Sequence, residues 1–189
     1  MSPPGECVKK RPPKRDHREV VERPEQVCLT PVGWIRSPYT ERHGTPRQPT
    51  VRGKDRPRAM EAGRVEFDPG FIPATALRDL EGFDRVWILT YLHLNPKWGP
   101  LVRPPRGEKR RGVFATRSPH HPNSIGLSAV EVVRVEGHTL HVRGLDLIDG
   151  TPVLDVKPYV PYCDAFPESA AGWVDEVSSP QPTGPEEAN

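Results

Sequence analysis

Residues 127–145 read LSAVEVVRVEGHTLHVRGL, and their pattern of apolar side chains indicates β-structure. Its first half is rich in valine, a β-branched residue that packs well on a pleated strand. In residues 139–143, leucine and valine alternate with histidine and arginine, which is the period of a strand buried on one face. Gly137 lies between the two halves in a short polar segment typical of a turn. We therefore expect an antiparallel hairpin whose turn falls at residues 135–138.

Short apolar segments of the same kind recur along the chain. They lie at residues 27–35, 64–67, 86–92, 112–115, 127–135, 139–145 and 153–156. Short strands at this spacing, separated by turn residues, are typical of a small barrel or sandwich. Only residues 73–80, PATALRDL, look helical, because their leading proline suits the first turn of a helix. The sequence thus predicts an all-β domain with one or two short helices.

Proline accounts for 25 of the 189 residues, well above its usual share of about 5%. Because proline breaks helix interiors and removes a donor from sheet ladders, this content argues against a mainly helical fold and predicts rigid loops. Residues 1–27 and 178–189 have almost no apolar side chains, so we expect them to be disordered tails. The ordered domain is then expected to span residues 28–177.

The overall composition excludes several classes of protein. The formal net charge is only +2, so any nucleic-acid surface must come from a local cluster of charges. No apolar run approaches the ~18 residues of a membrane span, and the basic N-terminus lacks the apolar core of a secretory signal. The cysteines, Cys7, Cys28 and Cys163, are scattered and odd in number. This pattern argues against a disulfide framework and favours a reducing cytoplasm.

Two loops carry polar side chains that suit a ligand. Arg47 and Gln48 lie between prolines, and together they present a guanidinium and an amide from a stiff loop. On residue types alone, however, a solvated surface loop is favoured for this segment. Asp146 and Asp149 flank a turn in front of Gly150. Their carboxylates could accept hydrogen bonds from a ligand, or they could cap the turn itself.

A basic segment and three histidines complete the set of candidate residues. The basic side chains are Arg103, Arg106, Lys109, Arg110, Arg111 and Arg117. Such a density suits a phosphate backbone, and an ordinary solvated run of charges is the alternative. His93 stands alone at a strand end, and the adjacent His120 and His121 would point to opposite faces of a strand. The sequence therefore predicts no metal site.

Common catalytic templates are absent from the sequence. It contains no Gly-x-Ser-x-Gly, no phosphate-binding glycine loop and no Gly-x-Gly-x-x-Gly motif. A Rossmann-type cofactor site is therefore disfavoured, and no catalytic residue can be assigned from residue types.

Read in order, several strings resemble one family. They are VGWIRSPY at 32–39, PRQ at 46–48, LEGFDRVWIL at 80–89, RPPR at 103–106, GVFATRSP at 112–119, PNSIGLS at 122–128 and DGTPVLDVKPY at 149–159. The chain is similar to the TsaA-like family, which includes the TrmO-type tRNA adenine-N6 methyltransferases. The resemblance covers residues 28–165 and is carried by strings of high specificity.

This resemblance implies a small antiparallel β-barrel that binds S-adenosylmethionine and forms a homodimer, with the cofactor near the subunit interface. It implies tRNA as substrate, methylated at N6 of a threonylcarbamoyl-modified adenosine at position 37. The family's cofactor-contacting positions match Arg47, Gln48, Pro49, His93, Leu94, Arg117, Leu127, Asp146, Leu147, Ile148 and Asp149. Arg47 or Arg117 could bind the cofactor's carboxylate, and Asp146 or Asp149 its amino group or ribose.

Two departures from the family pattern bear on the acceptor. His121 occupies a position where the family commonly has arginine, which removes a permanent charge. The bacterial enzymes also carry a C-terminal domain with an Asp-Pro-Arg-Pro-type motif, and no such motif follows the barrel strings here. Two alternatives therefore stay open: a methyltransferase with another acceptor, and a module that binds the cofactor or RNA without catalysis.

Overall fold

The predicted hairpin is present in the computed structural model, which describes residues 23–41, 45, 62–95, 97–105 and 107–178. Strand β6 (Ile125–Glu136) pairs antiparallel with β7 (Thr139–Arg143), and Glu136 lies opposite Thr139. Gly137 has a φ of 59°, a left-handed conformation that glycine adopts without strain. The turn therefore falls where the sequence predicted it.

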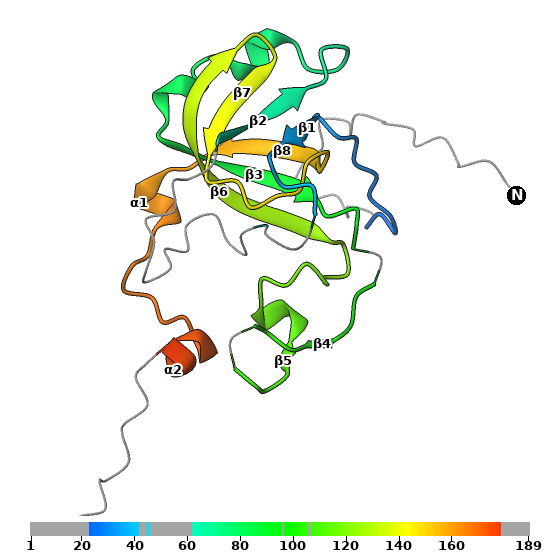
Figure 1. Ribbon diagram of the computed structural model, residues 1–189, viewed down its shortest axis with the longest axis vertical. Coiled ribbons are helices and arrows are strands. Elements are labelled where there is room, and N and C mark those ends of the chain that lie inside the picture. Colours follow the sequence, from blue (N-terminus) through cyan, green and yellow to red (C-terminus); the bar gives the residue numbers. More distant parts are fainter. Residues whose placement is uncertain (1–22, 42–44, 46–61, 96, 106, 179–189) are drawn as a thin grey trace, which may run out of the picture. The chain divides into compact units, whose positions relative to one another are not determined.

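The hairpin belongs to a closed antiparallel barrel (Figure 1). Its strand order is β1-β2-β7-β6-β3-β8. The remaining strands are β1 (Gly33–Arg36), β2 (Ala62–Phe67), β3 (Arg85–Tyr91) and β8 (Pro152–Pro158). Closure comes from β8, which pairs with β1 on one side and with β3 on the other. The closed sheet has no open edge. The prediction of a small antiparallel barrel is confirmed.

Alternating side chains fill the barrel. Along β3, Val86, Ile88 and Thr90 are fully buried, while the residues between them reach the surface. The same alternation on the other strands produces one apolar core. Its buried members are Ile35, Val65, Phe67, Leu77, Val86, Ile88, Val130, Leu140, Val142, Leu145, Leu147 and Val153.

Three predicted elements differ from the structure. In place of one helix over residues 73–80, the chain forms the 3₁₀ helix η1 (Ala74–Leu77) and then a second one, η2 (Leu80–Gly82), because Asp79 adopts a left-handed φ of 68° that interrupts helical geometry. The segment predicted as a strand at 112–115 is mostly the 3₁₀ helix η3 (Val113–Ala115). The first strand begins only at Gly33, and residues 23–30, a separate unit by their contacts, contain no strand.

A second group of elements lies outside the barrel. Between β3 and β6, residues 92–124 include a two-stranded sheet of β4 (Leu101–Val102) and β5 (Arg111–Gly112), followed by η3. We call residues 92–124 the arm. After β8 come two short helices, α1 (Pro161–Asp164) and α2 (Trp173–Ser178).

The predicted tails at 1–27 and 178–189 lie outside the described residues, except for residues 23–27 and Ser178. The proposed domain limits therefore stay predictions. Within the described part of the chain, no helix is long and apolar enough to cross a membrane.

Candidate functional site

Polar side chains replace apolar ones at one end of the barrel interior. Ser128, on β6, is buried and donates a hydrogen bond of 2.6 Å from its Oγ to Oδ1 of Asp146. Asp146 follows the end of β7, so its carboxylate lies where β6 begins and β7 ends. The barrel thus places a largely enclosed carboxylate at one of its ends.

The charge state of Asp146 is set by opposing effects. Burial raises the pKa of the Asp146 carboxyl above its ordinary value, because the charged form loses hydration. The Ser128 hydroxyl, the backbone and the positive charge of Arg117 act in the opposite direction. Arg117, an exposed residue of the arm, is therefore close enough to act on Asp146 electrostatically.

This raised pKa predicts how stability depends on pH. A group whose pKa is higher in the folded state than in the unfolded state makes its full contribution to stability at pH values below the unfolded-state pKa. That contribution is lost as the pH rises through the folded-state pKa. At neutral pH the charged Asp146 therefore costs stability. We expect Asp146→Asn, which keeps an acceptor for Ser128, to raise the free energy of unfolding at pH 7. The gain should shrink toward zero as pH falls to the unfolded-state pKa. Urea titrations at several pH values measure this, and a variant equally destabilised at every pH would contradict it.

Thr90 adds a second polar group at this end of the barrel. Its side chain is fully buried, and among the described residues its Oγ1 is the buried side-chain atom that lacks a hydrogen-bond partner. Gly126 lies directly opposite Thr90 in the β3–β6 register, two residues from Ser128. A Cβ at Gly126 would collide with the Thr90 hydroxyl, so glycine keeps that space open. Buried polar groups normally have hydrogen-bond partners. The Thr90 hydroxyl departs from this rule, so it is free to donate and accept beside the site.

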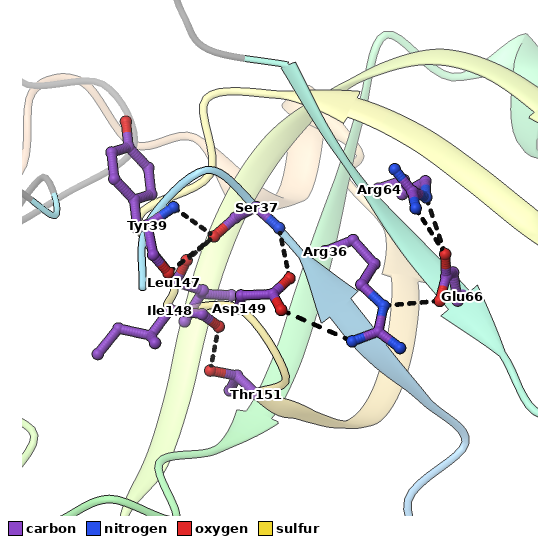
Figure 2. A network of polar contacts seen from close by, with 9 residues as sticks. All are labelled: Arg36, Ser37, Tyr39, Arg64, Glu66, Leu147, Ile148, Asp149 and Thr151. Carbon is purple, nitrogen blue, oxygen red and sulfur yellow. Dashed lines mark hydrogen bonds and ion pairs between the residues drawn. The ribbon is translucent and has the colours of Figure 1, made fainter. Parts of the chain in front are cut away.

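Asp149 belongs to a different network (Figure 2). Its Oδ1 accepts a hydrogen bond of 3.0 Å from the Ser37 N–H, and its Oδ2 lies 3.6 Å from Nη1 of Arg36. The Ser37 hydroxyl in turn donates to the Leu147 carbonyl at 2.7 Å. These contacts tie the turn at 147–151 to the chain that leaves β1. Asp146 and Asp149 therefore serve separate networks despite their closeness in sequence.

Glu66 extends this second network across to β2. It accepts from Nε of Arg36 at 2.7 Å and from Nε of Arg64 at 2.9 Å. These hydrogen bonds lower the pKa of the Glu66 carboxyl below its ordinary value, with Arg36 contributing most. Because Arg36 ends β1 and Arg64 lies near the start of β2, the network fixes both ends of the connecting loop (Figure 2).

This connecting loop carries three of the predicted site residues. Arg47, Gln48 and Pro49 lie outside the described residues. An open depression adjoins the two ends of their loop. It is lined by Arg36, Ser37, Pro38, Thr40, Ala62, Gly63, Arg64 and Asp149.

The other predicted site residues are distributed between core and surface. His93 and Leu94 form the turn that leaves β3, where the His93 N–H donates to the Tyr91 carbonyl at 2.8 Å. Leu94 is 63% exposed and Leu127 is 52% exposed. Leu147 packs in the barrel core, and Ile148 receives the Thr151 hydroxyl on its carbonyl. The structure thus places Arg117 within electrostatic reach of Asp146, and it places Asp149 and Leu147 in the framework of the barrel.

Sequence reasoning missed Ser128 and Thr90. A signal was available, because both occupy inward positions of strands whose other inward residues are apolar. A hydroxyl at such a position is unexpected in a core that serves packing alone.

His121 is the residue that departs from the arginine of the family pattern. Its Nε2 lies 3.1 Å from the Thr116 carbonyl, so it contributes to the internal structure of the arm.

The fold and the polar barrel end define a class: a small closed antiparallel β-barrel with polar side chains at one end, distinct from the Rossmann fold. Residues 34–165 match the family described as the tRNA-methyltransferase O N-terminal domain. The chain belongs to this family.

Known relatives agree with this assignment. The chain is 42% identical over 151 residues to a tRNA (adenine(37)-N6)-methyltransferase of Escherichia coli, covering 75% of this chain and 61% of that protein. It is 39% identical over 153 residues to a Pyrococcus abyssi protein named "Probable S-adenosyl-L-methionine-binding protein", covering 81% and 79%. The crystal structure of TrmO from Pseudomonas aeruginosa matches with a TM-score of 0.63 and 38% identity, covering 78% and 62%.

The relatives differ in how much of their length the match occupies. The chain spans about three fifths of the bacterial proteins, 61% for the one from E. coli and 62% for the P. aeruginosa structure. It spans 79% of the archaeal protein. The residues that the family model matches, 34–165, contain nearly the whole barrel.

Proposed function

We propose that this chain binds S-adenosylmethionine at the barrel end marked by Asp146 and transfers its methyl group to N6 of an adenosine in tRNA. The observation that carries the proposal is the partly buried Asp146 carboxylate, held by Ser128 and influenced by Arg117, in a domain of the tRNA-methyltransferase O family. The acceptor is the threonylcarbamoyl-modified adenosine at position 37, as the resemblance implies.

The residues at this end fit the chemical groups of the cofactor. Arg117 offers a guanidinium for the carboxylate of the methionine moiety, and Asp146 accepts hydrogen bonds from its amino group or from the ribose. Leu94 and Leu127, both exposed, provide apolar surface for the adenine. The partnerless Thr90 hydroxyl supplies one more polar group nearby. When bound, the cofactor supplies a methyl group already activated by its sulfonium.

The protein's own contribution is then orientation. Methyl transfer to an amine is an in-line displacement, for which correct positioning can provide much of the rate enhancement. Asp146 is fixed by Ser128, and the network in Figure 2 joins the end of β1 to β2, the two strands between which Arg47, Gln48 and Pro49 lie in the sequence. We place these three residues, with His93, in the same cofactor site.

The surface beside the site supports a homodimer. Tyr91 and Ile125 lie opposite each other in the β3–β6 register and are 46% and 47% exposed. Leu127, two residues further along β6, extends this apolar surface. A second copy covering it would bury apolar area next to the cofactor, which is favourable in water. We propose that the dimer acts in the cytoplasm, where its tRNA substrate is found.

A comparison of tRNA nucleosides tests the proposal in the cell. We expect a strain lacking this protein to lose one methyl group from an adenosine-derived nucleoside of the anticodon loop. Liquid chromatography with mass detection of digested tRNA measures this, and re-expression should restore the methyl group. Identical nucleosides in the two strains would contradict tRNA as the acceptor.

A further inference from the structure

The chain that follows the barrel returns to the arm. We call residues 159–178 the strap. Near its end, Nε1 of Trp173 donates a hydrogen bond of 2.7 Å to the Ala115 carbonyl in η3. The Arg111 guanidinium lies 5.2 Å from the centre of the Trp173 ring and 3.3 Å from the Glu176 carboxylate. Helix α2 thus contacts both β5 and η3.

The other end of the strap is fixed to the barrel. Nε1 of Trp87, on β3, donates to Oδ2 of Asp164 at 3.1 Å, and the same oxygen accepts from the Val160 N–H at 2.8 Å. The Trp87 ring also packs against Tyr159, with ring centres 5.4 Å apart. The strap therefore links the barrel wall to the arm through one indole at each end.

The contact on the arm lies next to a site residue. Ala115 precedes Arg117 by two residues, and the turn between them is fixed locally. The Thr116 hydroxyl donates to the Val113 carbonyl at 2.8 Å and accepts from the Ser118 N–H at 3.3 Å. Because this turn is held together internally, a displacement of η3 would carry Arg117 with it.

We propose that the strap is a positioning device in which Trp173 holds η3, and so fixes the position of Arg117. This inference rests on the proposed function, since it assumes that Arg117 contacts the cofactor. The family match ends at residue 165, so α2 and Trp173 lie beyond the part of the chain that the match covers. Trp173 is accordingly a positioning residue that acts through Arg117.

Two substitutions of Trp173 and one control substitution test whether the strap positions Arg117. Trp173→Ala removes both the hydrogen bond and the stacking, and we expect the Kd for S-adenosylmethionine to rise about 3- to 10-fold. Trp173→Phe keeps a ring under Arg111 and should give a smaller rise. Trp34→Phe, an indole replacement on β1, is the matched control and should leave the Kd within about twofold of wild type. Isothermal calorimetry on the full chain measures these values.

A double-mutant cycle separates positioning from a general loss of structure. If Trp173 acts through Arg117, Trp173→Ala should have little further effect on the Kd once Arg117→Ala is present. In steady-state assays the change should appear in KM for the cofactor more than in kcat. Fully additive effects of the two substitutions would overturn the proposal.

Hydrogen exchange without cofactor keeps this inference distinct from the proposed function. We expect Trp173→Ala to speed amide exchange in residues 107–117 while the barrel strands remain protected. Unchanged exchange in the arm would overturn the strap, whether or not the cofactor binds. Faster exchange in a chain whose wild type fails to bind S-adenosylmethionine would support the strap and contradict the proposed function.

Discussion

Asp146→Asn is expected to weaken S-adenosylmethionine binding about 10- to 100-fold. The substitution keeps the size of the side chain and an acceptor for Ser128, but it removes the negative charge that we propose interacts with the ligand. Hydrogen bonds to charged groups contribute about 1.5–3 kcal/mol, which corresponds to this range of affinity. Isothermal calorimetry at pH 7 measures the change. The same substitution should stabilise the ligand-free protein, so weaker binding could not be attributed to unfolding.

Asp155→Asn is the matched control for this experiment. Asp155 is a carboxylate on β8 that pairs with Lys157 at 2.8 Å, and both side chains are substantially exposed. Exposed ion pairs contribute little, so this variant should bind the cofactor like wild type. Wild-type affinity in Asp146→Asn would contradict the placement of the cofactor at this end of the barrel.

Gly33→Ala should destabilise the barrel by about 3 kcal/mol. A Cβ at this position would collide with the Glu66 carbonyl on β2 and would lie 2.8 Å from the Phe67 Cα. Both obstacles are backbone atoms of β2, the strand paired with β1. The collision can therefore be relieved only if β1 and β2 move apart at this position. Urea denaturation of the purified variant measures the loss.

Gly82→Ala provides the comparison for that variant. Gly82 ends η2, and a Cβ there would meet no atom within 4 Å. We expect its stability to stay within about 0.5 kcal/mol of wild type. Equal stabilities of the two alanine variants would show that the close approach at Gly33 is not a constraint on the barrel.

The hairpin could be predicted from sequence because its determinants are local. The alternation in residues 139–143 and the glycine at 137 act over a few residues, and the structure follows them. Barrel closure could not be derived in this way, since it depends on β8 pairing with two distant strands. Residue patterns alone allowed a sandwich as well, and the choice of a barrel came from the resemblance.

The expected helix at 73–80 shows where local rules fail. A proline at the start and a leucine-containing run suited a helix, but Asp79 takes a left-handed conformation and the segment splits into two 3₁₀ turns. Leu77 is nevertheless buried in the core. We infer that packing of Leu77 against the barrel outweighs the preference of this segment for an α-helix.

The candidate site was only partly accessible to sequence reasoning. Its acidic turn and basic segment were recognised, but residue types left the roles of Asp146 and Asp149 open. The structure distinguishes them, because Asp146 is enclosed beside Ser128 while Asp149 holds Ser37 and Arg36. Such a distinction depends on tertiary contacts between segments far apart in sequence.

Methyl transfer by the purified full chain tests the proposed activity without the need for a cell. The protein is incubated with S-adenosylmethionine carrying a labelled methyl group and total tRNA, and the tRNA is digested to nucleosides. We predict label in an N6-methylated adenosine derivative from position 37, with at least a tenfold loss of rate for Asp146→Asn at subsaturating cofactor. Cofactor binding without label in any tRNA nucleoside would contradict the claim and would favour a binding module or another acceptor.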